Sequence, residues 1–146
     1  KHIKSDVFFA NYTDGLTDLN LNKYLDFFNN NSKAAGSFIS VKPMLPFHSI
    51  DLNKNGIVNS INPPGKMKNF LINAGYFIFK KDIFNYINEG EELVEEPLNR
   101  LANENKLISY EHDGFWKNID NIKDKEFIDK LYHSGKAPWV LWDSIK

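Results

Sequence analysis

Residues 70–79 read FLINAGYFIF, the most apolar run of the chain and the one richest in strand-forming residues. Phenylalanine, isoleucine and tyrosine favour β-strands, and the loop-forming residues 62–65 (NPPG) precede the run. A strand of this composition is typical of one that is covered on both faces. We therefore expect residues 70–79 to lie near the centre of a sheet.

Further strand signals lie on both sides of this run. Residues 7–10 (VFFA) form a short apolar stretch that ends at a turn-rich segment, which predicts a strand buried on both faces. Residues 36–42 (GSFISVK) alternate in polarity until Pro43 and Pro46 end the pattern. We also expect extended segments at 107–110 and 115–120.

Helical periodicity appears between the strands. Within residues 19–31, apolar side chains recur at spacings of three and four, which predicts an amphipathic helix. Shorter helices are predicted at 80–89 and 93–103, and another runs from an N-cap at Asp124 to His133 before Gly135. Strands mixed with helices predict an α/β fold, with residues 1–146 forming a single domain.

Composition excludes several classes of protein. The 146 residues are 42% hydrophobic, and 18 lysines and arginines face 19 acidic residues. Without a basic excess, nucleic acid is not an expected partner. No apolar run approaches the roughly 20 residues of a membrane-spanning helix, so no membrane partner is expected either. The sequence has no cysteine, which is compatible with a cytoplasmic protein.

Two aspartates stand where chemistry is expected. Asp14 follows the predicted strand 7–10 within Tyr12-Thr13-Asp14-Gly15, and Asp120 ends the segment 115–120. In open α/β sheets ligands bind beyond the carboxyl ends of strands, so carboxylates there could share a divalent cation. Asp-Gly is also a common turn dipeptide, and two isolated aspartates make no spacing signature, so a turn and a solvated loop remain the alternatives.

Residues 51–62 offer a different metal hypothesis. Oxygen-bearing side chains alternate from Asp51, and Gly56 stands sixth, as in a calcium-binding loop. The twelfth position is Asn62 rather than a bidentate acid, and Pro63 prevents an outgoing helix. Asn55-Gly56 is a strong hairpin signal, so a surface hairpin is the favoured interpretation.

The motifs together resemble a known family. The chain is similar to the sugar-1-phosphate nucleotidyltransferases, most closely to glucose-1-phosphate cytidylyltransferase. The resemblance extends over essentially the whole sequence. Its clearest segments are Tyr12-Thr13-Asp14-Gly15, Ile72-Asn73-Ala74-Gly75-Tyr76-Phe77, Glu95-Glu96-Pro97-Leu98, Arg100-Leu101-Ala102, Gly114-Phe115-Trp116, Asp120 and Ser134-Gly135-Lys136-Ala137-Pro138-Trp139.

This resemblance implies a Rossmann-like α/β/α fold, with a mixed sheet covered by helices and incomplete at its N-terminal side. It implies transfer of a cytidylyl group from CTP to a sugar 1-phosphate, glucose 1-phosphate being the first expectation. Pyrophosphate is released, and the CDP-sugar supplies a polysaccharide such as O-antigen. Asp14 and Asp120 would be the catalytic residues that bind Mg²⁺. The partners are the two substrates and further copies in a homo-oligomer, and the implied substrate-binding residues are Tyr12, Gly15, Asn73, Gly75 and Lys66.

The sequence departs from the family pattern at one motif. The family's Glu-Lys-Pro aligns with Ile61-Asn62-Pro63, so the acid and the phosphate-binding lysine are absent there. Lys66 or Lys68 could replace that cation, or the sugar could differ. The alternative function is a non-catalytic sugar-phosphate-binding or assembly domain with the same fold. The family's glycine-rich nucleotide loop would precede Lys1, so this segment alone is expected to lack strong CTP binding.

Overall fold

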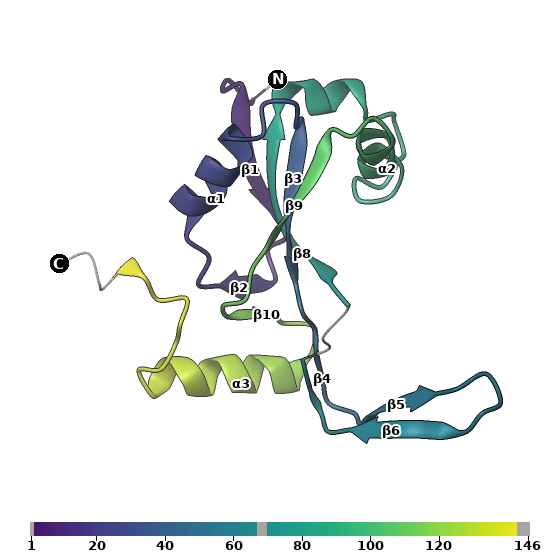
Figure 1. Ribbon diagram of the computed structural model, residues 1–146. Coiled ribbons are helices and arrows are strands. Elements are labelled where there is room, and N and C mark those ends of the chain that lie inside the picture. The colour runs from purple at the N-terminus through teal and green to yellow at the C-terminus, as the bar shows by residue number, and fades with distance from the viewer. Residues whose placement is uncertain (1, 67–69, 143–146) are drawn as a thin grey trace.

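The computed structural model describes residues 2–66 and 70–142. Its elements follow the chain as a mixture of strands and helices, shown in Figure 1. They are β1 (Val7–Asn11), β2 (Gly15–Thr17), α1 (Leu21–Asn29), β3 (Gly36–Val41), β4 (Met44–Leu45), β5 (Ser49–Leu52), β6 (Val58–Asn62), β7 (Gly65–Lys66), β8 (Ile72–Lys80), the 3₁₀ helix η1 (Lys81–Asn85), α2 (Glu96–Asn103), β9 (Leu107–Glu111), β10 (Trp116–Asn118) and α3 (Ile122–His133).

A four-stranded mixed sheet in the order β1-β8-β3-β9 forms the centre of the fold (Figure 1). β8 runs antiparallel to β1 and β3, whereas β3 and β9 are parallel. The prediction for residues 70–79 is confirmed, because β8 is an interior strand. Its Ile78 is 0% exposed and Phe77 and Phe79 are each 2% exposed.

Helices cover both faces of this sheet. Side chains alternate along β8, so neighbouring residues belong to different cores. One core packs helix α1 on the sheet and includes Tyr24, Phe28, Ile39, Val41, Ala74 and Ile78. The other packs helix α2 and includes Ala35, Phe77, Phe79, Ile83, Leu98 and Leu101. The predicted α/β class is confirmed, and Figure 1 shows α1 and α2 on opposite sides of the strands.

Strand β1 corrects one expectation. Within the described residues it pairs with β8 alone and forms an edge of the sheet. Phe9 is 46% exposed, so the prediction that residues 7–10 are buried on both faces is wrong. Phe8 does pack, with its ring centroid 6.0 Å from that of Phe79 and 5.9 Å from that of Phe84. Apolar composition identifies a strand but does not show whether a layer covers each of its faces.

The segment around Asn55-Gly56 forms the predicted hairpin. β5 and β6 are antiparallel, and Asp51 lies opposite Ser60 within the ladder rather than in a metal-binding loop. Asn53 Oδ1 accepts hydrogen bonds from the backbone N–H groups of Asn55 (2.9 Å) and Ile57 (3.0 Å). Gly56 has a φ of +79°, which glycine adopts without strain. Figure 1 shows β5 and β6 projecting away from the central sheet.

The helices differ from their predicted bounds. Only the 3₁₀ helix η1 forms within the predicted helix at 80–89. Helix α3 is capped by Asn121, whose Oδ1 accepts from the Asp124 backbone N–H at 3.1 Å, so the predicted N-cap at Asp124 is wrong. Gly135, with a φ of +69°, ends the helix as predicted. Among the described residues, no helix is both long and apolar enough to cross a membrane.

Candidate functional site

A two-stranded sheet brings the two candidate acids together. β2 follows β1 after a short turn and pairs antiparallel with β10, with Gly15 opposite Asn118. One step beyond, the backbone N–H of Ile119 donates a 2.9 Å hydrogen bond to the carbonyl oxygen of Asp14. Asp120 is the next residue along the chain. Asp14 and Asp120 therefore occupy adjacent backbone positions at one end of this small sheet, and both residues are exposed.

A polar network surrounds Asp120. The Asn118 side-chain amide donates to the Asp120 carboxylate. The Asp120 backbone N–H donates to Asp124 Oδ2 at 3.3 Å, and Lys117 Nζ lies 2.6 Å from Asp124 Oδ1. The hydrogen bond from Lys117 holds the pKa of Asp124 below its ordinary value. Through these contacts the first turn of α3 holds the backbone that carries Asp120. The sequence analysis did not identify Asp124 and Lys117 as supporting residues.

Tyr12, Asn73 and Gly75 meet where β1 and β8 end their pairing. The Tyr12 N–H donates to the Gly75 carbonyl at 2.9 Å, and the Gly75 N–H donates to Asn73 Oδ1 at 2.9 Å. Gly75 is buried with a φ of +74°, and a Cβ there would lie 2.4 Å from Cδ2 of Tyr12. Both backbone groups of Gly75 are engaged within the protein, so this glycine sets the positions of Asn73 and the Tyr12 ring.

Tyr76 and Trp116 connect the small sheet to β8, and neither was a candidate from the sequence. The Tyr76 hydroxyl donates to the Gly15 carbonyl at 2.6 Å, and Trp116 Nε1 donates to the Ala74 carbonyl at 2.9 Å. Burial, and secondarily the Asp14 carboxylate, raise the pKa of Tyr76, which keeps its hydroxyl protonated as a donor. Their place within the segments Ile72-Asn73-Ala74-Gly75-Tyr76-Phe77 and Gly114-Phe115-Trp116 was the only signal in the sequence.

A second cluster fixes the other end of β2. Asp18 Oδ1 accepts from the Phe115 backbone N–H at 2.8 Å and lies 2.9 Å from His112 Nε2. The Thr17 hydroxyl donates to the Phe115 carbonyl at 2.8 Å. A Cβ on Gly114 would lie 2.3 Å from Asp18 Oδ1, so glycine is required for this approach. The β9–β10 turn, and with it the start of β10, is thereby attached to β2.

Of the two lysines proposed to bind the sugar phosphate, Lys66 and Lys68, the structure describes only the backbone of the first. The backbone of Lys66 lies in β7, opposite Met44 of β4, and Lys68 lies outside the described residues. Ile61 and Asn62, which align with the family's Glu-Lys, lie in β6 of the projecting hairpin. Lys42 contacts acidic partners, with Nζ 2.6 Å from Glu111 Oε1.

The donor set fits magnesium. In the parts of the chain that the structure describes, no group of three or more histidine, cysteine or acidic residues could hold a metal ion. Mg²⁺ in phosphoryl-transfer sites is commonly held by one or two carboxylates, with substrate phosphates and water completing six oxygen ligands. Asp14 and Asp120, which are exposed and lie on adjacent backbone, match that pattern. Such a site does not need all six ligands to come from the protein.

Sequence comparison provides named relatives. Proteins of Salmonella typhimurium (strain LT2) and Salmonella typhi, both named glucose-1-phosphate cytidylyltransferase, are each 32% identical over 145 residues. The match covers 98% of this chain and 56% of each relative, so the chain spans about half the length of the curated relatives it matches. No protein-family model matches the chain.

Structure comparison provides the fold. A crystal structure of a Bacillus anthracis protein, provisionally described as a glucose-1-phosphate thymidylyltransferase and bound to sucrose, superposes with a TM-score of 0.60. It is 15% identical, and the match covers 88% of this chain and 55% of that one. The expected Rossmann-like nucleotidyltransferase fold and the resemblance read from the sequence motifs are therefore confirmed.

Proposed function

We propose, from the similarity of this chain to glucose-1-phosphate cytidylyltransferases over nearly its whole length, that it is part of a sugar-1-phosphate nucleotidyltransferase. The observation that carries the proposal is the adjacency of Asp14 and Asp120, produced by the hydrogen bond between Ile119 and Asp14. Both residues lie in segments that resemble the family's motifs. Tyr12 follows the end of β1, two residues before Asp14, and Asn73 lies at the start of β8, and these two residues would line the sugar subsite.

In this reaction an oxygen of the sugar 1-phosphate attacks the α-phosphorus of CTP. The bond between the α-phosphorus and its bridging oxygen breaks, and pyrophosphate leaves with the electron pair. Mg²⁺, when bound, would offset negative charge on the phosphates during the transfer. The two aspartates would supply its protein ligands, and no covalent intermediate with the protein is required, because positioning and electrostatics supply most of the catalysis.

The other residues would position the sugar. The Asn73 amide nitrogen would donate to a sugar hydroxyl while its Oδ1 accepts from Gly75, which orients the amide. The Tyr12 ring, held edge-on against Phe77 at 5.6 Å, would form one wall of the subsite. Because Gly15 has no side chain, it would allow the substrate to approach the protein main chain closely. Lys66 remains our candidate for the sugar phosphate, and a CDP-sugar for polysaccharide synthesis in the cytoplasm is the proposed product.

Pyrophosphate release tests the proposal. The full-length protein would be assayed with CTP, Mg²⁺ and a panel of sugar 1-phosphates, alongside Asp14→Asn and Asp120→Asn. Each substitution should lower turnover by at least about 100-fold while leaving the thermal midpoint nearly unchanged, because both residues are exposed. Asp26→Asn, an exposed aspartate of α1, is the matched control and should retain full activity.

A second function is favoured by one observation. Ile61 and Asn62 replace the family's acid and lysine, so an acid and a cation that face the sugar phosphate are missing from that motif. A non-catalytic sugar-phosphate-binding or assembly domain would tolerate this loss. Absence of turnover with every nucleotide, together with retained sugar 1-phosphate binding by calorimetry, would select this alternative and reject the enzyme.

A further inference from the structure

The two faces of strand β10 are turned toward different parts of the fold. Side chains alternate along a strand, so Trp116 and Asn118 project from one face and Lys117 from the other. Trp116 Nε1 donates to the Ala74 carbonyl of β8 at 2.9 Å, whereas Lys117 Nζ lies 2.6 Å from Asp124 Oδ1 of α3. Figure 1 shows β10 between the central sheet and α3. Asn118 therefore projects from the face that contacts β8, which carries the candidate sugar-binding residues.

Asn118 and Asp120 are neighbours on this face. Beyond the pair of Asn118 with Gly15, the ladder continues with the 2.9 Å hydrogen bond from the Ile119 N–H to the Asp14 carbonyl, so the backbone stays extended. Residues two apart on extended backbone project to the same side. The Asn118 side-chain nitrogen Nδ2 accordingly donates to Oδ2 of the Asp120 carboxylate.

This hydrogen bond engages one oxygen of Asp120 and leaves the other available. Among the residues whose side chains the structure describes, Asn118 is the one that donates to this carboxylate, and it does so at Oδ2. An ionised carboxylate has two oxygens with about four acceptor positions, so Oδ1 can still bind a cation. Asp120 is exposed whereas Asn118 is half-buried, so the better-packed residue holds the more mobile one.

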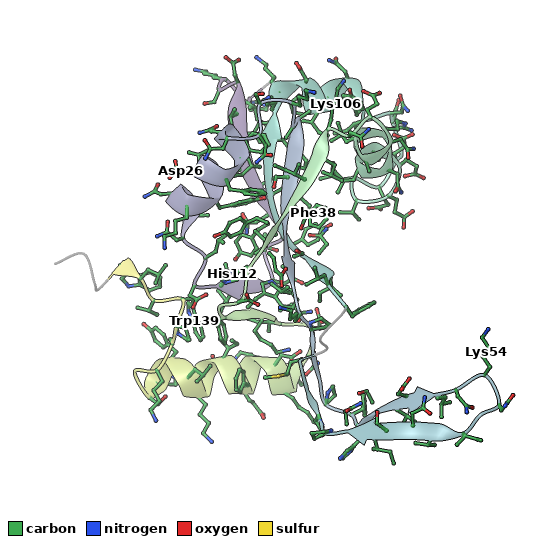
Figure 2. All side chains as sticks on the ribbon, viewed as in Figure 1. Asp26, Phe38, Lys54, Lys106, His112 and Trp139 are labelled. Atoms are coloured by element: carbon green, nitrogen blue, oxygen red, sulfur yellow. The ribbon has the colours of Figure 1, made fainter. Side chains whose placement is uncertain are left out.

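The strand that carries Asn118 is itself held in place. The Phe115 ring, directly before β10, packs against Trp139 with 5.3 Å between ring centroids, and the Phe115 N–H donates to Asp18. Figure 2 shows Trp139 and His112 between the central sheet and α3, in the region where β10 begins. A side chain on a strand fixed in this way can orient a neighbouring ligand more precisely than one on a free loop.

We propose that Asn118 is a positioning residue of the candidate metal site, which holds the Asp120 carboxylate in the orientation that binds Mg²⁺. The inference rests on the proposed function. Carboxylates that bind metals are commonly oriented by hydrogen bonds from neighbouring groups, and loss of such a neighbour lowers metal affinity about 10–100-fold. Mg²⁺ demands near-ideal octahedral geometry, so it is sensitive to how its ligands are oriented. Asn118 acts through Asp120 and needs no contact with the substrates.

Mn²⁺ binding to the full-length protein tests this role without relying on activity. Mn²⁺ replaces Mg²⁺ at oxygen ligands, and the electron paramagnetic resonance signal of the free ion reports how much is bound. Asn118→Ala should weaken Mn²⁺ binding about 10–100-fold. Asn118→Leu, which has a similar shape but no donor, should give the same loss and serves if the alanine variant folds poorly. Asn99→Ala, at an exposed asparagine of α2, is the matched control and should leave the affinity unchanged.

A Mg²⁺ titration of pyrophosphate release separates positioning from general damage to the site. In Asn118→Ala the Mg²⁺ concentration for half-maximal activity should rise, turnover should recover at saturating Mg²⁺, and the KM for the sugar 1-phosphate should not change. Turnover lowered equally at every Mg²⁺ concentration, or Mn²⁺ affinity unchanged in both folded Asn118 variants, would overturn the positioning role alone. A wild type that does not bind Mn²⁺ would reject the metal assignment of the proposed function together with this inference.

Discussion

The indole Nε1 of Trp116 donates a 2.9 Å hydrogen bond to the backbone carbonyl of Ala74. Trp116 begins the strand that leads to Asp120, and Ala74 is the 4% exposed neighbour of Asn73. This bond, together with that from the Tyr76 hydroxyl to the Gly15 carbonyl, connects the candidate metal-binding segment to the candidate sugar-binding segment. The attachment of β10 to β8 therefore contributes to the relative position of these two segments.

Trp116→Phe should weaken that attachment. The substitution retains an aromatic ring but leaves the Ala74 carbonyl without its donor, which costs about 1–3 kcal/mol in a buried setting. Urea denaturation should show this loss of stability, and the Mg²⁺ concentration for half-maximal activity should rise. Trp142→Phe is the control, because Trp142 is 60% exposed and its replacement should change stability by less than about 0.5 kcal/mol. Equal losses from both variants would contradict the assigned role.

Gly75→Ala should be more destabilising than an alanine at another glycine with the same backbone conformation. Gly56 has a φ of +79° and nothing within 4 Å of the place that a methyl group would take. Gly56→Ala therefore reports only the cost of placing a side chain on left-handed backbone, about 1–2 kcal/mol. At Gly75 the methyl group would also meet the Tyr12 ring at 2.4 Å. We expect an additional loss of about 1–3 kcal/mol by urea denaturation, partly recovered in Gly75→Ala/Tyr12→Ala. The absence of any recovery would show that the ring contact is not the cause.

Asp18→Ala should release the turn that precedes β10. Asp18 Oδ1 is shared by the Phe115 N–H and His112, so its removal leaves the Phe115 donor unpaired. The expected loss is about 1–3 kcal/mol, measured by urea denaturation, with faster hydrogen exchange at residues 115–118. Asp26→Ala on the surface of α1 should change neither quantity. Unchanged exchange at 115–118 in Asp18→Ala would remove Asp18 from the support of β10.

The Glu91–Arg100 pair predicts a pH-dependent contribution to stability. Hydrogen bonds from Arg100, and then from Asn88, lower the pKa of Glu91 from 4.5 to about 2. Because the folded pKa is depressed, the contribution is complete above pH 4.5 and is lost as the pH falls toward 2. The difference in thermal midpoint between wild type and Glu91→Gln should therefore shrink across this window.

Glu89→Gln is the matched control for that measurement. Glu89 is an exposed glutamate of the same loop, and its substitution should give no difference that varies across the window. A wild-type advantage over Glu91→Gln that stays constant down to pH 2 would contradict the assigned ion pair.

Local patterns were sufficient to predict much of the fold. The composition of residues 70–79 predicted the interior strand β8, and the Asn55-Gly56 dipeptide predicted the hairpin. Both signals depend on neighbouring residues only, through strand propensity and through the positive φ that glycine tolerates. The exposure of Phe9 was not predictable in this way, because it depends on which layers surround an edge strand.

The candidate site was predictable only in part. Asp14 and Asp120 were identified through motifs that resemble a family, and no local periodicity could pair the three-residue strands β2 and β10. The contributions of Tyr76 and Trp116 depend on hydrogen bonds between segments far apart in the chain. Such bonds leave no periodic trace in the sequence, so the supporting residues emerged only from the structure.

The late position of β10 in the chain has a consequence for biosynthesis. A ribosome releases the segment carrying Asp14 long before the segment carrying Asp120, so the emerging polypeptide first presents a lone carboxylate. Only after residues 116–120 have left the exit tunnel and docked beside β2 does the second acid arrive. A product terminated before residue 116 would thus lack the acidic pair even if its central strands had folded.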